Sequence, residues 1–156
     1  MASSWAAWLS AQGLTPGDRC AILAHNDAHW CAAYLGILKL GAVVVPLDTN
    51  YSAAQVATIV ADSGARRLLV SDKLREKAAA AGVPLTNVHD VPPDLGQEPT
   101  MVDPAVPAVI LYTSGTTSDP KGVVLSHGNL LAERDAAFAV VDVTDRDAIL
   151  GVLPLF

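Results

Sequence analysis

The stretch that decides the fold is "RCAILAHNDAHWCAAYLGILKLGAVVVPLD", residues 19–48. Its first six residues (19–24) form the kind of short apolar run that is typical of a buried strand. Asn26 or Asp27 is suited to cap a following helix, because both side chains accept hydrogen bonds from first-turn N–H groups. Apolar residues then recur at helical spacing until Gly41, namely Trp30, Ala33, Tyr34, Ile37 and Leu38. "AVVVPL" (42–47) is a second strand, so the stretch predicts a parallel strand–helix–strand unit.

The segment before this unit adds a helix. We expect Ser3 or Ser4 to cap it and Gly13 to end it. Its apolar face consists of Trp5, Trp8 and Leu9. The turn "TPGD" (15–18) then leads into the first strand.

The segment after this unit repeats the alternation. Ser52 and Gln55 have the spacing of a capping box, which predicts a helix over 53–62. "RRLLVS" (66–71) is a third strand, and 72–82 is a third crossover helix whose charged start forms a solvated face.

Alternating strands and helices predict an α/β fold, in which a parallel-rich sheet is flanked by helices. Residues 1–89 would form its first βα half, and 90–107, with five of the ten prolines, a surface connection. Residues 108–156 would supply a hairpin, a helix over 128–141 and a final strand over 148–156. A terminal buried strand leaves an unpaired edge, so we expect the N-terminal part of a larger domain, with edge-strand pairing of two copies as a hazard.

The composition excludes several classes of protein. The formal net charge of −6 argues against a nucleic-acid binder, which needs a basic face. The longest apolar stretch (31–47) is interrupted by two glycines, a lysine and a proline, so it predicts no transmembrane segment. The N-terminus lacks the pattern of a signal peptide, so a cytoplasmic location is predicted. Cys20 and Cys31 are then expected to be reduced core residues.

The stretch "LYTSGTTSDPKGVVLSHGNL" (111–130) predicts a hairpin whose loop is longer than a simple turn needs. Its hydroxyls, glycines and single cation suit a phosphate group: Ser114, Thr116, Thr117 and Ser118; Gly115 and Gly122; and Lys121. Ordering about nine loop residues costs about 1–2 kcal/mol each, so we expect a mobile loop without ligand. A plain polar hairpin tip is the alternative, because the same residue types dominate turns. Tyr112 is expected to be a core residue beneath the loop.

A P-loop NTPase is disfavoured, although Gly115 and Lys121 have the separation of the first Gly and the Lys in that motif. Pro120 precedes the lysine where the motif has Gly, and Gly122 follows it where the motif needs a hydroxyl for magnesium. A strand follows the loop, whereas the motif opens a helix.

"YTSGTTSDPKGVVLSH" closely resembles the phosphate-binding signature of the adenylate-forming (AMP-binding) superfamily, which includes acyl-CoA synthetases, luciferases and peptide-synthetase adenylation domains. "GDRCAILAHNDAHWCAAYLGILKLGAVVVPLD" and "DSGARRLLVSD" resemble the opening α/β part of these enzymes, in the right order. The terminal "LPLF" matches the start of a further family motif. The resemblance therefore covers essentially the whole chain and favours a functional loop.

The resemblance implies an ATP-dependent ligase, most like the acyl-CoA synthetase branch of fatty acid metabolism. A carboxylic acid would form an acyl-adenylate, and the thiol of coenzyme A or of a phosphopantetheine carrier would then accept the acyl group. The residues implied to bind the β- and γ-phosphates of ATP are Ser114, Gly115, Thr116, Thr117 and Lys121, with Lys121 acting electrostatically. Thr113 is the implied contributor to Mg²⁺ binding.

Two departures keep a second hypothesis open. Ser118 stands where the family generally has Gly, and the family's adenine contacts, magnesium-binding Glu, acyl pocket and catalytic Lys all lie further along. We therefore expect no adenylation by these 156 residues alone. The alternative is a non-catalytic remnant or interaction module that keeps the scaffold, and a third, weaker one is a plain doubly wound nucleotide-binding domain.

The remaining histidines and cysteines do not predict a metal site. Cys20, His25, His29 and Cys31 crowd together, but their spacing matches no common zinc pattern. His89 is isolated in the sequence. His127 is expected to begin the helix after the hairpin in a structural role.

Overall fold

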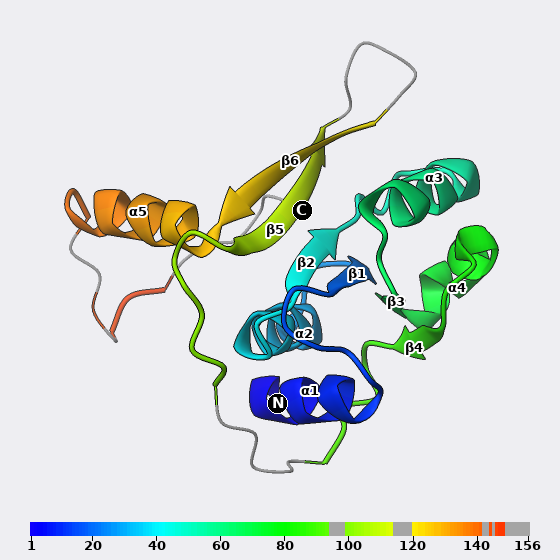
Figure 1. Ribbon diagram of the computed structural model, residues 1–156, viewed down its shortest axis with the longest axis horizontal. Helices are drawn as coiled ribbons and strands as arrows, with labels where there is room; N and C mark the ends of the chain where they lie inside the picture. Colours follow the sequence, from blue (N-terminus) through cyan, green and yellow to red (C-terminus); the bar gives the residue numbers. More distant parts are fainter. Residues whose placement is uncertain (94–98, 114–119, 142–143, 145, 149–156) are drawn as a thin grey trace.

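The computed structural model describes residues 1–93, 99–113, 120–141, 144 and 146–148 (Figure 1). Within these residues the strands form a six-stranded sheet in the order β4-β3-β1-β2-β5-β6. The strands are β1 (Arg19–Leu23), β2 (Val43–Pro46), β3 (Arg67–Val70), β4 (Leu85–Asn87), β5 (Pro107–Thr113) and β6 (Lys121–Ser126). The pairs from β4 to β5 are parallel, and β6 pairs antiparallel with β5. The predicted α/β class with a parallel-rich sheet is confirmed.

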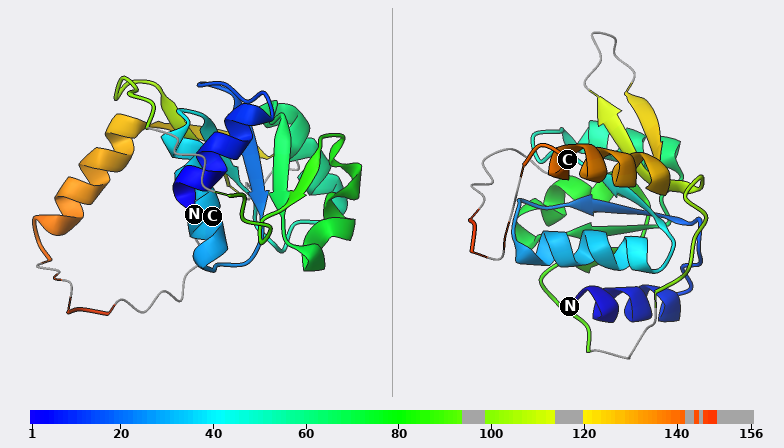
Figure 2. Two further views of the ribbon diagram at one scale, coloured as in Figure 1. Left: turned by 90° about the horizontal axis from the view of Figure 1, so that it is seen from below. Right: turned by 90° about the vertical axis from the view of Figure 1, so that its left-hand side faces the viewer.

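Helices cover both faces of this sheet (Figures 1 and 2). On one face lie α1 (Ala2–Ala11) and α2 (Ala28–Lys39), and on the other lie α3 (Ala53–Ser63) and α4 (Arg75–Ala78). Alternate residues of one strand therefore enter different cores: Cys20 and Ile22 face α1 and α2, while Ala21 and Leu23 face α3. Because both faces are covered, β1 and β2 read as continuous apolar runs rather than as alternating ones.

Local sequence signals account for where most helices begin. Asp27 caps α2, with its carboxylate accepting a hydrogen bond from the Trp30 N–H at 2.7 Å. Ser52 and Gln55 form the predicted capping box of α3. Ser126 forms another with Asn129 at the start of α5 (His127–Phe138).

The predicted cap of α1 is wrong. The helix begins at Ala2 after Met1, and Ser4 is buried within it. The first turn extends this far because it packs on α2, where a Cβ added at Gly36 would lie 2.8 Å from the Ala2 carbonyl oxygen. Tertiary packing therefore outweighs the capping preference of the serines.

Three further predictions need correction. The helix expected over 72–82 is broken into a 3-10 turn η1 (Asp72–Leu74), the short α4 and a second 3-10 turn η2 (Ala79–Ala81). The edge strand β4 was not predicted, because its "LTN" sequence is short and partly polar. Cys31 is exposed on the outer side of α2, whereas Cys20 is buried as expected.

Several predictions concern residues near the C-terminus. The helix expected over 128–141 is α5, which runs from His127 to Phe138. Most of the final strand expected over 148–156 lies outside the described residues. Among the helices that the structure describes, none is long and apolar enough to cross a membrane.

Gly36 allows the close contact between α1 and α2, so Gly36→Ala is expected to destabilise the fold. The new Cβ would lie 2.5 Å from Trp5 Cβ and 2.8 Å from the Ala2 carbonyl oxygen, and neither atom is the end of a flexible side chain. Overpacking of this kind costs about 1–3 kcal/mol, which outweighs the ~1 kcal/mol that Ala gains in helix propensity. Urea denaturation measures the free energy of unfolding.

Leu35→Ala is the matched control, since Leu35 is the neighbouring residue on α2 and is 55% exposed. Its effect should stay within about 0.5 kcal/mol. Equal stability of Gly36→Ala and the parent would show that α1 can move away from α2 without loss.

Candidate functional site

The hairpin of β5 and β6 brings two of the predicted site residues together. In its register Thr113 lies opposite Lys121, and Tyr112 lies opposite Gly122. Residues directly opposite each other in an antiparallel pair point to the same face, with Cβ atoms about 4.5–5.5 Å apart. Thr113 and Lys121 are both exposed. A hydroxyl and an ammonium group therefore lie side by side at the loop end of the hairpin, where an anion can reach both.

The remaining candidates of this loop, Ser114, Gly115, Thr116 and Thr117, lie outside the described residues. The same holds for Ser118 and for the expected mobility of the loop without ligand.

Tyr112 ties the end of β5 to the helical layer beside it. Its hydroxyl donates a hydrogen bond to Asp62 of α3 at 2.5 Å, and the Tyr51 hydroxyl donates to the Tyr112 carbonyl at 3.2 Å. Burial and the Asp62 carboxylate raise the pKa of Tyr112 above its ordinary value, so its hydroxyl stays protonated and remains a donor. A side chain of α3 and one of the loop before it thus fix the residue that directly precedes Thr113.

The expectation of a core position for Tyr112 is only partly correct, because its ring packs against the core while its hydroxyl is hydrogen-bonded outside it. Asp62 and Tyr51 lie 50 and 61 residues away in the sequence. No local pattern could therefore have indicated this anchor.

The structure gives a steric explanation for the glycine at position 122 that the sequence did not indicate. A Cβ at this position would lie 3.0 Å from both Ile110 Cγ2 and Tyr112 Cζ. The sequence suggested that Gly122 lets the main chain approach a phosphate. The structure adds that it leaves room for the cross-strand ring of Tyr112.

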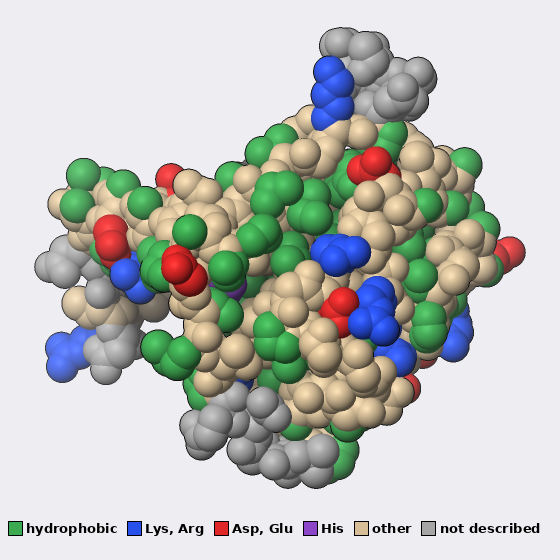
Figure 3. All heavy atoms as spheres, viewed as in Figure 1, with side chains coloured by type: hydrophobic (Ala, Val, Ile, Leu, Met, Phe, Trp, Pro, Cys, Tyr) green, Lys and Arg blue, Asp and Glu red, His purple; other side chains and the backbone are tan. Residues whose placement is uncertain are grey.

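The hairpin and the helix after it expose apolar side chains (Figure 3). Val123 and Val124 of β6 are 47% and 55% exposed, and Leu131 and Phe138 of α5 are 42% and 58% exposed. Because β6 is also the edge of the sheet in the described residues, its outer backbone groups lie beside this apolar surface.

The histidines and cysteines near β1 are arranged differently from the sequence expectation. Burial raises the pKa of the Cys20 thiol to about 12, while Cys31 lies exposed on α2. His89 is not isolated: its Nε2 lies 2.8 Å from Asp27 Oδ2, and its ring lies edge-on to that of His29. The sequence could not show this cluster, because His89 comes from the segment after β4, 62 residues from Asp27.

Asp27 is ionised in this cluster. Burial favours its neutral form, but hydrogen bonds from the Trp30 N–H and His89 outweigh burial and lower the pKa of Asp27. His127 is the remaining histidine singled out in the sequence. It begins α5 as predicted, and its buried Nε2 has no hydrogen-bond partner among the described residues.

Comparisons with known proteins agree with this fold. The long-chain-fatty-acid–CoA ligase FadD13 of Mycobacterium tuberculosis is 34% identical over 95% of this chain and 32% of its own length. The fatty acid–[acyl-carrier-protein] ligase ScoC of Streptomyces coeruleorubidus is 37% identical over 82% of this chain and 27% of its own. The o-succinylbenzoate coenzyme A synthetase MenE of Bacillus subtilis, solved in complex with AMP, superposes with a TM-score of 0.82 and 28% identity.

This MenE alignment covers 99% of this chain and 42% of the MenE chain. The chain spans about a third of the length of FadD13 and about a quarter of the length of ScoC. The model of the AMP-binding enzyme family matches residues 1–156. By this match and by the fold that surrounds the hairpin, the chain belongs to the AMP-binding enzyme family.

Proposed function

We propose that this chain is the N-terminal part of an enzyme that activates a carboxylic acid with ATP and transfers the acyl group to a thiol. The observation that carries the proposal is the hairpin end at which Thr113 lies opposite Lys121. The relatives support it, since their names describe ligases for coenzyme A or for an acyl carrier protein. The proposed partners are a small carboxylic acid, ATP and the thiol of coenzyme A or of phosphopantetheine, which the cytoplasm supplies.

The chemistry of such a ligase is an electrostatic problem. A carboxylate oxygen attacks the α-phosphorus of ATP, the bond to the β-phosphate oxygen breaks, and pyrophosphate leaves with the electron pair. Lys121 would reduce the repulsion between the two anions by placing a fixed positive charge at the β- and γ-phosphates. The neighbouring donors of the loop would hold the same oxygens, namely Ser114, Gly115, Thr116 and Thr117.

Magnesium is the metal that ATP chemistry in this family implies. It takes oxygen ligands in an octahedral arrangement and usually keeps several waters beside substrate phosphates. The exposed hydroxyl of Thr113 would supply one such ligand beside the phosphates. Bound there, the ion would neutralise part of the triphosphate charge.

A second candidate function is a scaffold that binds without catalysing, and Ser118 favours it. The family generally has Gly at this position, and a Ser that must adopt a left-handed conformation costs about 1–2 kcal/mol. Activity assays on the full protein separate the two candidates.

We predict that residues 1–156 alone do not catalyse carboxylate-dependent exchange of pyrophosphate into ATP, because the family's adenine contacts, acyl pocket and catalytic Lys lie further along. The full protein that carries this chain should catalyse the exchange with one class of carboxylic acid, which a panel of acids would identify. Pyrophosphate exchange by the 156-residue chain would contradict the proposal that adenylation needs residues further along.

In the full protein, Lys121→Ala together with Thr116→Ala is expected to lower kcat/KM for ATP by about 10²–10⁴-fold. The reason is that hydrogen bonds to a charged group contribute about 1.5–3 kcal/mol each. Steady-state kinetics at saturating carboxylate measures the change. Arg134→Ala is the matched control, because Arg134 is an exposed cation of α5 that pairs with its neighbour Asp135. Unchanged ATP binding and turnover in the double variant would contradict the proposed role of the hairpin.

Tyr112→Phe removes the hydroxyl that holds β5 to α3 and leaves the ring in place. Loss of one hydrogen bond of about 0.5–1.5 kcal/mol predicts a KM for ATP raised about 2–10-fold, with little change in kcat. Tyr34→Phe is the control, since Tyr34 stacks on Trp30 in α2, on the face of the sheet opposite to α3. A loss of stability with an unchanged KM would mean that the tether serves the fold alone.

A further inference from the structure

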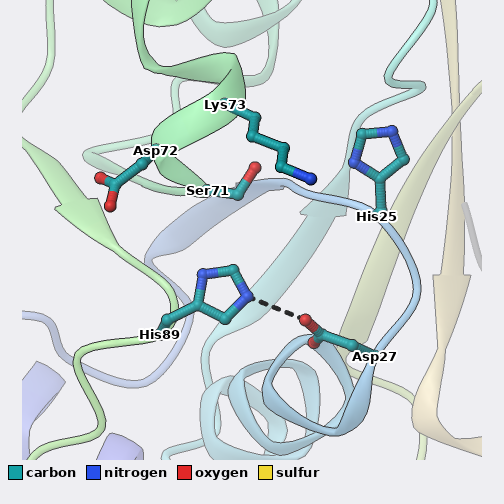
Figure 4. Close-up of a pocket in the computed structure, with 6 residues that line it drawn as sticks. All are labelled: His25, Asp27, Ser71, Asp72, Lys73 and His89. Carbon is teal, nitrogen blue, oxygen red and sulfur yellow. Dashed lines mark hydrogen bonds and ion pairs between the residues drawn. The ribbon is translucent and has the colours of Figure 1, made fainter.

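A second candidate site lies at the carboxyl ends of β1, β3 and β4, away from the hairpin. A cavity of about 420 Å³ opens there (Figure 4), lined by His25, Asp27, Ser71, Asp72, Lys73 and His89. After β1 the chain turns into α2 on one face of the sheet, and after β3 it turns into η1 and α4 on the other. Ligands of open α/β sheets bind in the crevice at such a divergence.

Three metal-ligating side chains meet beside this cavity. Asp27 Oδ2 lies 2.8 Å from His89 Nε2 and 4.0 Å from His29 Nδ1, and all three atoms lie within 4.8 Å of one another. Zinc binds imidazole nitrogen and carboxylate oxygen at about 2.0–2.2 Å, which places tetrahedral donor atoms about 3.4 Å apart. The observed distances lie on either side of this separation. Side-chain rotations that move the donor atoms by a few tenths of an ångström to about one ångström would bring all three to bonding distance from one ion.

Hydrogen bonds orient Asp27 and the main chain of His89 beside the cavity. The Trp30 N–H occupies the Oδ1 side of Asp27 at 2.7 Å, which leaves Oδ2 to the histidines. The His89 main-chain N–H donates to Asn87 Oδ1 at 3.0 Å. His29 lies in the first turn of α2, two residues after Asp27. The side chains are 37–41% exposed, so an ion can enter from solvent and their rotamers can adjust.

Ser71 gives a second, independent indication of a ligand. It is only 5% exposed and lines the same cavity, and its buried Oγ has no hydrogen-bond partner among the described residues. An unpaired buried hydroxyl is costly, and a ligand in the cavity would supply the partner. In Figure 4 the Ser71 hydroxyl and the Asp27 carboxylate lie on different sides of the cavity, and His89 lies between them along its rim.

We propose that Asp27, His29 and His89 bind a transition-metal ion of the Zn²⁺ type, with a coordination position open towards the cavity. Two imidazoles and one carboxylate suit this class of ion, whereas Mg²⁺ and Ca²⁺ take oxygen ligands. A metal ion takes the lone pair of His89 Nε2, so a proton on that nitrogen must move to Nδ1 or leave to solvent, and the two imidazoles then bind as neutral ligands. Asp72 adds a second carboxylate to the cavity, while Lys73 and the N-terminus of α2 oppose a cation and limit the affinity.

The test uses the full protein that carries this chain, produced without a polyhistidine tag and with Cys31→Ser to remove a nearby exposed thiol. Calorimetric titration with Zn²⁺, and with Co²⁺ followed by visible absorption, should show one ion per chain. Mg²⁺ should give no heat at this site. Thermal unfolding should shift upwards with Zn²⁺, because a ligand that binds only the folded state stabilises it.

His89→Gln and His29→Gln are each expected to weaken Zn²⁺ binding by about tenfold or more, since even indirect partners of metal ligands contribute about 10–100-fold. His25→Gln is the matched control, a histidine that lines the same cavity outside the donor set. Asp27→Asn preserves the helix cap, so it tests the carboxylate without removing the start of α2. Circular dichroism confirms that each variant is folded.

Equal Zn²⁺ affinity of the parent, His29→Gln and His89→Gln would overturn the proposal and leave the cluster as a hydrogen-bonded ion pair only. An equal loss in His25→Gln would overturn the assigned donor set. The proposal does not depend on the ligase function, because none of its residues belongs to the hairpin, and Zn²⁺ binding is measured without ATP.

Discussion

The pairing of β2 with β5 is the contact on which the arrangement of this chain depends. It joins Val44 to Val109 and so makes one sheet from two segments that are separated by the proline-rich connection. Both residues are buried, as is Ala108 beside them. Without this ladder the hairpin would be an isolated pair of strands, which is marginally stable in water. With this ladder, the loop end of the hairpin has a fixed direction relative to the carboxyl ends of the parallel strands.

The elements that could be predicted are those whose signals are local. Asp27 and the Ser52–Gln55 pair identify helix starts because a cap is a contact within a few residues. The register of β5 and β6 follows from two apolar runs close together in the chain. The sequence misled where distant packing decides. The first turn of α1 lies on Gly36, so Ser4 is buried instead of capping.

The same distinction applies to the two candidate sites. The hairpin could be found from the sequence because Thr113 and Lys121 belong to one continuous motif. The anchor of that hairpin, which Asp62 and Tyr51 form with Tyr112, could not, because its members come from α3, from the loop before it and from β5. His89 reaches Asp27 only because the strand before it, β4, lies parallel to β3 at the edge of the sheet. The spacing of histidines and cysteines in the sequence therefore does not indicate this cluster.

The fit between Gly122 and the ring of Tyr112 has a consequence for how these positions can change in evolution. Any side chain at 122 would contact the ring across the strands, so it requires a smaller residue at 112. That replacement would in turn deprive Asp62 of its hydroxyl donor. Positions 62, 112 and 122 are therefore expected to covary in related sequences, as a group coupled by steric fit on one side and by a hydrogen bond on the other.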